Sequence, residues 1–126
     1  SACRYCEMEY QKSDRNILEN ELWFANYDIH PVSRGHTKII SKRHVNFIAD
    51  LTNEELISMK KIMRDVTELI YQKFHPGGYN IGINQGAPAG QTVFHLHIHY
   101  IPRYAGDVDD PTGGVRNIIP KNKNSL

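Results

Sequence analysis

The sequence predicts an antiparallel α+β domain, and three observations lead there. The chain has 126 residues, of which 40% are apolar and 23% charged, as expected of one ordinary globular domain. One segment has the periodicity of a long helix, and short strand patterns lie on both sides of it along the chain. A polar turn before the last strand adds a hairpin, so neighbouring strands are expected to run antiparallel.

The long helix is predicted between Thr52 and the turn formed by residues 75–78. Thr52 and Glu55 have the spacing of a capping box, in which a hydroxyl accepts from the N3 amide and a carboxylate reaches back. Apolar residues then recur at steps of three and four, which predicts one buried face. They are Leu56, Met59, Ile62, Met63, Val66, Leu69, Ile70 and Phe74. The sequence His-Pro-Gly-Gly ends the helix, because proline and glycine disfavour its continuation.

Four short segments are predicted to be strands. Residues 22–25 and 37–41 precede the helix, and residues 79–84 and 93–101 follow it. Residues 85–90 form a loop between the last two. Beyond Pro102 the chain is rich in turn residues, so we expect 104–126 to be an ordered loop followed by a frayed end. The whole chain, 1–126, is expected to be a single domain with its core in about 3–103.

Charge and hydropathy exclude several functions. Fifteen basic and fourteen acidic residues leave a formal charge of +1, so no global field draws the chain to nucleic acid or to an anionic membrane. No apolar run approaches the roughly 18 residues of a spanning helix, and the first residues lack a signal pattern. We therefore expect a cytoplasmic protein without nucleic-acid or membrane partners, whose chemistry lies in its seven histidines and two cysteines.

His95, His97 and His99 alternate with apolar residues, and a strand would put all three imidazoles on one face. The other face, which would pack inward, carries Phe94, Leu96, Ile98 and Tyr100. A lone histidine on such a face is most often a solvated side chain, but three in register favour a chemical role. They could ligate a metal, or act on a phosphate as nucleophile, orienter and donor. The outer two α-carbons would lie about 13 Å apart, which disfavours three ligands on one tetrahedral ion.

The segment before the histidines favours the phosphate interpretation. Amide and hydroxyl donors stand at Asn84, Gln85, Gln91 and Thr92, and the glycines between them leave the backbone open to a ligand. Composition alone would make this segment a polar hairpin loop. Its position beside the histidines indicates that these donors bind phosphate oxygens.

Residues 90–103, GQTVFHLHIHYIPR, resemble the signature of the histidine triad (HIT) superfamily of nucleotide hydrolases and transferases. The resemblance extends back through residues 84–86, 43–45 and 31–36 to the Cys3-x-x-Cys6 pair, and covers roughly 3–103. It implies a HIT-like α+β fold, with an antiparallel sheet of about five strands, one long helix and a short one. It also implies a homodimer.

The resemblance assigns roles to the candidate site. His97 would attack the α-phosphorus of an AMP-containing purine nucleotide and form a covalent nucleotidyl-imidazole that water then cleaves. His99 would donate to the phosphate, and His36 would lie close to the site. The other implied nucleotide contacts are Asp28 on the ribose, Asn84 near sugar and phosphate, Gln85 near the bridging oxygen, and Gln91 and Thr92 on non-bridging oxygens. Residues near the implied purine pocket, each equally explicable as core, are Tyr5, Met8, Leu18 and Trp23.

Cys3 and Cys6 could form a disulfide, a redox pair or half of a metal site. A thioredoxin-like pair follows a strand and opens a helix, and no helix signal follows this one, so redox catalysis is disfavoured. Two cysteines and two histidines make the ligand set of a closed structural zinc site. In zinc-bearing members of the family the partners correspond to His44 and His95. The resemblance therefore implies a structural Zn²⁺ on these four residues, and the alternative is two free thiols.

Three functions were weighed. The favoured one is a nucleotide hydrolase or nucleotidyl transferase that cleaves at the α-phosphate of dinucleoside polyphosphates or nucleoside phosphoramidates. The second is a metal-dependent hydrolase in which the triad holds a catalytic ion. The third is a zinc-containing nucleotide-binding protein with little turnover, against which the intact His97, His99, Gln91 and Thr92 argue.

Overall fold

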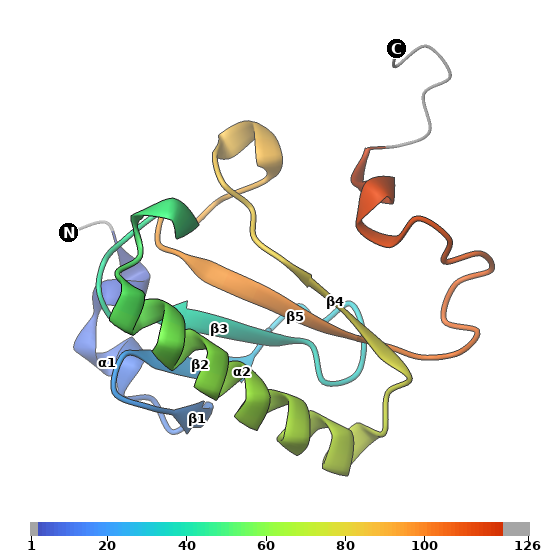
Figure 1. The fold of residues 1–126 in the computed structure, drawn as a ribbon, viewed down its shortest axis with the longest axis horizontal. Helices are drawn as coiled ribbons and strands as arrows, with labels where there is room; N and C mark the ends of the chain where they lie inside the picture. The colour runs from blue at the N-terminus through green and yellow to red at the C-terminus, as the bar shows by residue number, and fades with distance from the viewer. Residues whose placement is uncertain (1–2, 120–126) are drawn as a thin grey trace.

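The computed structural model describes residues 3–119, so the predicted frayed end beyond 119 lies outside the described residues. Five strands form one antiparallel sheet in the order β1-β2-β3-β5-β4 beside one long helix, α2 (Figure 1). The strands are β1 (Asn16–Glu19), β2 (Trp23–Tyr27), β3 (Thr37–Ser41), β4 (Gly78–Gly82) and β5 (His97–Arg103). The helices are α1 (Met8–Gln11), α2 (Asn53–Phe74) and the 3-10 turns η1 (Arg4–Cys6), η2 (Ile48–Asp50), η3 (Ala87–Ala89) and η4 (Gly114–Ile118). The predicted fold class is confirmed; strand β1 was not predicted.

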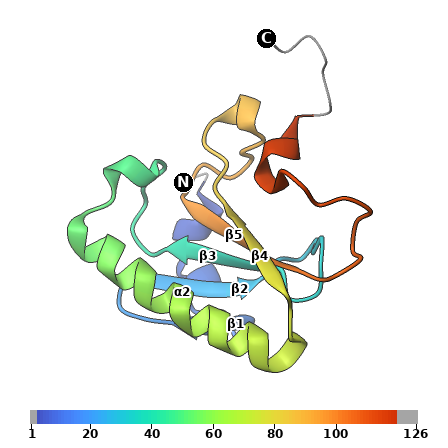
Figure 2. The same cartoon turned by 45° about the vertical axis from the view of Figure 1, so that its right-hand side comes forward.

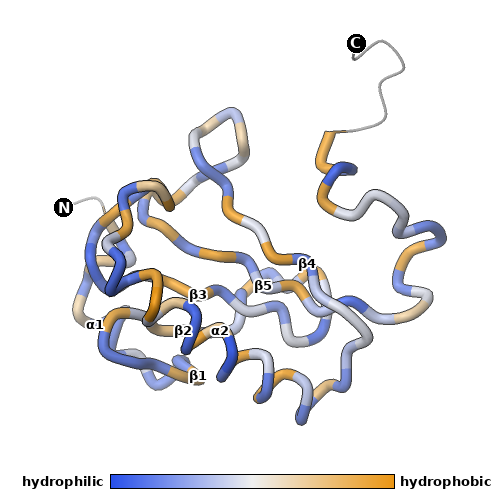
Figure 3. Tube along the Cα trace, viewed as in Figure 1, coloured by the Kyte–Doolittle hydropathy of each residue, from blue (hydrophilic) through white to orange (hydrophobic). Residues whose placement is uncertain are grey.

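Helix α2 begins and ends where the sequence predicts. Thr52 accepts from the Glu55 amide, the Glu55 carboxylate accepts from the Thr52 amide, and His75 ends the helix in the left-handed conformation. Apolar and polar segments alternate along its trace (Figure 3), and Ile62, Val66 and Ile70 form the buried stripe. The predicted burial of Leu56 is wrong, since this side chain is 40% exposed. Glu55 points inward in its place.

The two faces of the sheet are covered differently. α2 packs on one face, where the larger core includes Trp23, Ile39 and Ile98. The N-terminal segment with η1 and α1 lies on the other side of the strands from α2 (Figure 2), and a second, smaller cluster joins Tyr5 to Phe24 and Ile40. The histidines of β5 belong to this second face, because His97 pairs in register with Ile40.

The predicted strand 93–101 is partly wrong, because β5 begins only at His97. His95 lies before the strand, wholly buried, and Phe94 is 50% exposed rather than turned inward. The physical reason is that the segment crosses to the chain after β3: the Leu96 amide donates to the Val45 carbonyl at 2.7 Å. His95 therefore does not share its site with the other two triad histidines.

The N-terminal segment also differs from expectation. The sequence showed no helix signal after the cysteine pair, yet η1 ends at Cys6 and α1 begins at Met8. α1 is a single turn of four residues, too short to produce a periodic pattern.

None of the helices within residues 3–119 is long and apolar enough to cross a membrane.

Candidate active site and metal centre

A cleft of about 500 Å³ opens on the sheet face that carries the N-terminal segment. Five of the predicted site residues line it: His97 and His99 from β5, Asp28 just after β2, and Asn84 and Thr92 from the loop segment between β4 and β5. Residues that are far apart in sequence thus meet here because β2, β3 and β5 are neighbours in the sheet.

His97 is held in one tautomer. Its Nδ1 lies 2.8 Å from the carbonyl oxygen of His95, and because a carbonyl only accepts, Nδ1 must carry the hydrogen. Burial lowers the pKa of His97 below its ordinary value, so the ring is neutral at pH 7. Nε2 then keeps its lone pair, and His97 is an oriented nucleophile that needs no base to activate it.

The tautomer of His99 is fixed through His36. The Val32 amide donates to His36 Nδ1 at 3.2 Å, which leaves the hydrogen of a neutral ring on Nε2. That nitrogen lies 3.0 Å from His99 Nδ1, which must accept. Burial, with smaller effects from His97 and His36, lowers the pKa of His99 to about 4. Neutral His99 therefore carries its own hydrogen on Nε2, as a donor for a ligand in the cleft.

Asp28 adds an ionised carboxylate. Burial alone would raise its pKa, but the His30 amide, which donates at 2.9 Å, and the nearby His36 and Lys38 hold it below the ordinary value. Its Oδ2 lies 3.5 Å from His36 Nε2 and 3.6 Å from His99 Nδ1. Such a carboxylate can accept from hydroxyl groups, as the ribose contact implied for Asp28 requires.

Asp28, His36 and His99 also bring three potential metal-ligand atoms within 4.8 Å of one another. The hydrogen-bond pattern disfavours a cation there. His36 Nε2 could ligate only if Nδ1 held the hydrogen, and that hydrogen would face the Val32 amide hydrogen. The hypothesis that the histidines hold a catalytic ion is weakened accordingly.

Gln85 and Gln91, two of the predicted phosphate contacts, bind atoms of the surrounding loops and do not point into the cleft. Gln91 donates to Asn46 Oδ1 at 2.5 Å and to the Val93 carbonyl at 3.1 Å, while its oxygen accepts from the Gly86 amide at 2.8 Å. Gln85 accepts from the Ile48 amide at 2.7 Å. Both side chains hold the loop in shape and neither lines the cleft. Only Thr92 of the predicted non-bridging-oxygen contacts does.

The implied purine pocket is also only partly formed as expected. Tyr5 lines the cleft, but Met8, Leu18 and Trp23 do not. Trp23 is fully buried in the larger core, where its indole donates to the Glu55 carbonyl at 3.0 Å. Tyr10, Asn26 and Lys38 also line the cleft, and none of them was predicted from the sequence. The period-two alternation that links Asn26 to Asp28 along the chain was the available signal.

The second cluster is the predicted metal centre. Cys3, Cys6, His44 and His95 place their ligand atoms within 4.8 Å of one another. Sulfur to Nδ1 distances are 3.1 Å from Cys6 to His44, 3.2 Å from Cys3 to His95 and 3.3 Å from Cys6 to His95. Tetrahedral zinc bonded to sulfur and nitrogen separates such atoms by about 3.6 Å. The donor set and its geometry therefore fit Zn²⁺ after a small expansion.

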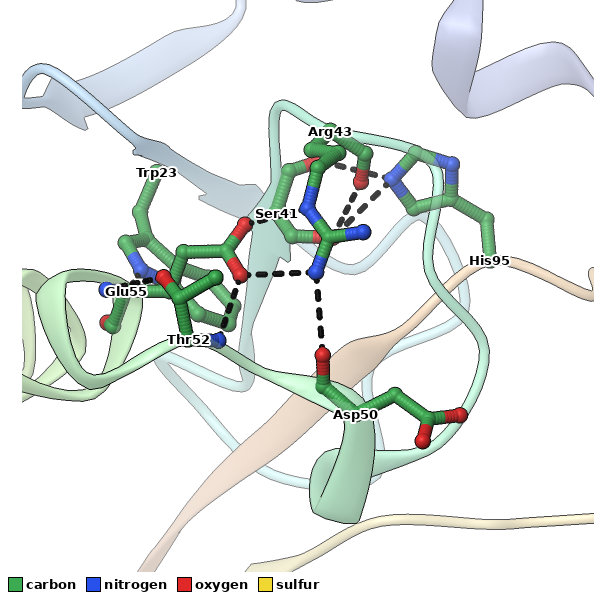
Figure 4. Close-up of polar contacts among 7 residues, drawn as sticks. All are labelled: Trp23, Ser41, Arg43, Asp50, Thr52, Glu55 and His95. Atoms are coloured by element: carbon green, nitrogen blue, oxygen red, sulfur yellow. Dashed lines mark hydrogen bonds and ion pairs between the residues drawn. The ribbon is translucent and has the colours of Figure 1, made fainter.

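Polar contacts behind the ligands support this fit (Figure 4). His95 Nε2 lies 2.6 Å from the Ser41 carbonyl oxygen, so Nε2 carries the hydrogen and Nδ1 is left with the lone pair that a metal requires. The Ser41 hydroxyl donates to the Arg43 carbonyl at 2.9 Å. Arg43 in turn contacts Asp50 and Glu55, which ties the segment before His44 to the start of α2.

Comparison with known proteins agrees with this geometry. The HIT domain family matches residues 9–106. A bis(5'-nucleosyl)-tetraphosphatase of Schizosaccharomyces pombe is 36% identical over 110 residues, which are 87% of this chain and 60% of that protein. A crystal structure of a HIT family protein from Bacillus anthracis has TM-score 0.76 and 36% identity, covering 85% of this chain and 77% of that one. A zinc-bound histidine triad protein from Mycobacterium smegmatis has TM-score 0.72 and 34% identity, covering 84% and 78%.

Proposed function

The chain belongs to the HIT domain family, and on that premise we propose that it is a nucleotide hydrolase or nucleotidyl transferase. Its substrates are dinucleoside polyphosphates or nucleoside phosphoramidates, cleaved at the α-phosphate through a covalent nucleotidyl-His97 intermediate. The observation that carries the proposal is the fixed tautomer of His97, whose Nε2 lone pair is available beside an N–H donor of His99. The tetraphosphatase relative supports a dinucleoside polyphosphate substrate, and the AMP-containing purine nucleotide is proposed on the resemblance.

The first step forms a bond between His97 Nε2 and the α-phosphorus while the bond to the leaving group breaks. The positive charge that develops on the imidazole is stabilised at Nδ1–H by the His95 carbonyl. From a dinucleoside polyphosphate, a nucleoside polyphosphate leaves with the bonding electron pair as an anion. From a phosphoramidate, the amine leaves with that pair and takes up a proton from solvent. His99 and Thr92 donate hydrogen bonds to the phosphate oxygens, which costs little reorganisation because His36 already orients His99.

The second step regenerates the enzyme. The oxygen of a water attacks the phosphorus, the bond to His97 Nε2 breaks, and the electron pair returns to the neutral imidazole. The proton of the water passes to solvent, and a nucleoside monophosphate leaves. Asp28 and Asn84 are proposed to hold the ribose and the sugar-phosphate junction, and Gln85 and Gln91 to shape the surrounding loop.

We propose a structural Zn²⁺ on Cys3, Cys6, His44 and His95, supported by the donor geometry and by the zinc-bound relative. When bound, the ion would supply a closed, charge-balanced link between the N-terminal segment and the sheet. Without a cation, burial and then Cys3 raise the pKa of the Cys6 thiol to about 11. We also propose a homodimer and a cytoplasmic location, on the resemblance and the composition alone; sedimentation analysis tests the first.

The test is a comparison of wild type with His97→Ala on diadenosine tri- and tetraphosphate, adenosine phosphoramidate and adenylyl sulfate. Wild type should turn over at least one substrate, and mass spectrometry of acid-quenched protein should show a nucleoside monophosphate adduct. Both signals should vanish in His97→Ala. His75→Asn is the control, because His75 only ends α2 and Asn tolerates the left-handed conformation. A His97→Ala protein with wild-type turnover contradicts the mechanism.

A second function is favoured by one observation. Gln91 is committed to the loop rather than to the cleft, as expected of a nucleotide-binding protein with little turnover. Tight binding of a nucleoside monophosphate by a wild type that turns over no substrate of the panel would establish this alternative.

A further inference from the structure

Lys38 is a buried cation inside the candidate active site. It lies in β3 with only 8% of its surface exposed, and it lines the same cleft as His97 and His99. Burial would lower its pKa, but hydrogen bonds to the Tyr10 and Tyr5 hydroxyls outweigh burial and raise it above the ordinary value. The lysine is therefore charged at pH 7. A buried charge is costly unless a partner compensates it. The two hydrogen-bond partners of Lys38 are neutral hydroxyl groups, and the nearest opposite charge named here is the Asp28 carboxylate, whose pKa Lys38 lowers.

The cluster of Lys38, Tyr5 and Tyr10 presents mainly donors to the cleft, whose acceptors are the carboxylates of Glu7, Glu9 and Asp28. An ammonium group has only donors, and Lys38 Nζ donates to the Tyr5 oxygen at 3.1 Å and the Tyr10 oxygen at 3.0 Å. Both phenol oxygens therefore accept, and their own hydrogens are left to donate. Asn26 Nδ2 also donates to the Tyr10 oxygen at 3.4 Å, and Asn26 Oδ1 is enclosed by protein atoms. The Tyr5 hydroxyl hydrogen is shared with Tyr10. A ligand thus meets the third ammonium hydrogen and one phenol hydrogen.

The position of the cluster corresponds to the base of a bound nucleotide. His99, Lys38 and Asn26 are successive cross-strand partners on β5, β3 and β2. Two strand spacings place Asn26 roughly 10 Å from His99 across the sheet, which is on the scale of a nucleoside monophosphate. With the phosphate at the β5 histidines and the ribose at Asp28, the base extends toward the tyrosines.

We propose that this protein prefers 6-oxopurine nucleotides, those of guanine or hypoxanthine, over adenine nucleotides, and that Lys38 with Tyr5 and Tyr10 determines the preference. Guanine presents two adjacent acceptors, O6 and N7, on one edge, and lysine recognises this pair. Adenine presents N7 beside the N6 amino group, whose hydrogens would face a cation. This inference rests on the proposed function and replaces the adenine that the resemblance implies with a 6-oxopurine.

A plainer role for the cluster is to pin the N-terminal segment to the sheet, since Tyr5 and Tyr10 both belong to that segment. Loss of a structural pin would weaken the binding of all nucleotides alike. Loss of a specificity contact would change the ratio of guanine to adenine affinity. The ratio is therefore the decisive readout.

The experiment measures the dissociation constants of GMP, IMP and AMP by calorimetry on the full, zinc-loaded chain. Wild type should bind GMP and IMP about tenfold more tightly than AMP, the scale of one specific base contact. Lys38→Met keeps the length of the stem without the charge and should bring the ratio close to one. Tyr10→Phe keeps the ring and should lower the ratio by a smaller factor. Lys42→Met, on a lysine that pairs with Glu19 outside the cleft, should leave it unchanged.

Three results would overturn the proposal: a wild type that prefers AMP, equal losses for all three nucleotides in Lys38→Met, or an unchanged ratio in a Lys38→Met protein that unfolds like wild type. If Lys38→Met does not fold, Tyr10→Phe tests the proposal in its place. An unchanged ratio of guanine to adenine affinity in Tyr10→Phe also contradicts the proposal. Product binding needs no turnover, so a guanine preference without hydrolysis would refute only the proposed function. Hydrolysis without a guanine preference would refute only this inference.

Discussion

Replacement of Glu55 by glutamine should destabilise the protein at neutral pH and destabilise it much less in acid. Glu55 is 4% exposed and accepts from Arg43 Nε at 2.9 Å and Nη2 at 2.8 Å. The Arg43 guanidinium, with a further contribution from the Thr52 amide, lowers the pKa of Glu55 to about 2 against burial. Glutamine can still accept from the Thr52 amide and close the capping box. The substitution therefore removes the charge together with the hydrogen bond that Arg43 Nε donates to Oε2.

The magnitude follows from the pKa. The difference between about 2 and 4.5 corresponds to about 3 kcal/mol at 1.36 kcal/mol per pKa unit. The Arg43 side chain is 49% exposed, and solvent screening reduces the expected loss to about 1–2 kcal/mol. Because the pKa of Glu55 is lowered in the folded state, its stabilisation is fully present above pH 4.5. It is lost as the pH falls from 4.5 towards 2.

Urea unfolding of wild type and Glu55→Gln at pH 7, 5 and 3 measures the effect. The difference in unfolding free energy should be about 1–2 kcal/mol at pH 7 and 5 and shrink by more than half at pH 3. Taking the difference removes the acid effects that both proteins share, such as ligand protonation at the metal centre. Glu54→Gln, an exposed neighbour in the same helical turn, should match wild type throughout. A Glu55→Gln difference that is equally large at pH 7 and pH 3 would refute the electrostatic reasoning.

Three further predictions concern the metal centre, the helix start and the orientation of His99. Cys3→Ala should lower the zinc content from about one ion per chain and lower the melting temperature, because the metal set joins the N-terminal segment to the sheet; metal-free wild type purified without chelator would speak against the site. Thr52→Ala should cost about 1 kcal/mol in urea unfolding, because it removes the hydroxyl that accepts from the Glu55 amide, and an unchanged midpoint would count against the capping box. His36→Ala removes the donor to His99 Nδ1, so it should raise the pKa of His99 above about 4 in an NMR titration and lower kcat more than it changes KM. His36→Gln keeps a donor for His99 Nδ1 and should recover part of kcat.

The parts of the fold that the sequence predicted are those determined locally. The capping box, the apolar stripe and the stop at residues 75–78 lie within one segment, and α2 has these bounds. Strand β1 carried no such pattern, since three of its four residues are half-buried and the fourth, Glu19, is exposed, and its pairing at the edge of the sheet has an irregular register. Its strand conformation depends on pairing with β2, which no local signal records.

The candidate site was predictable where a residue has one plausible partner type and unpredictable where it has several. A cysteine pair at this spacing has few uses, and the resemblance to the family supplied His44 and His95 as its partners, which the structure brings together with it. Gln91 is an amide that can serve a phosphate or a loop equally well, and its contacts with Asn46 and Gly86 depend on the folded chain. Lys38 was not predicted as a site residue because a lysine in a short strand normally reaches solvent. Here the tyrosines of the N-terminal segment cover it.

His95 connects the two sites, and this connection explains why three alternating histidines do not share one role. Its side chain takes part in the metal set through Nδ1 and is fixed by Ser41 through Nε2. Its carbonyl oxygen holds the Nδ1 hydrogen of His97. A side chain anchored at both nitrogens restricts the backbone that bears this carbonyl, and therefore the direction of the nucleophile. The first histidine thus acts on the second through the main chain, which requires that β5 begin at His97 rather than at residue 93.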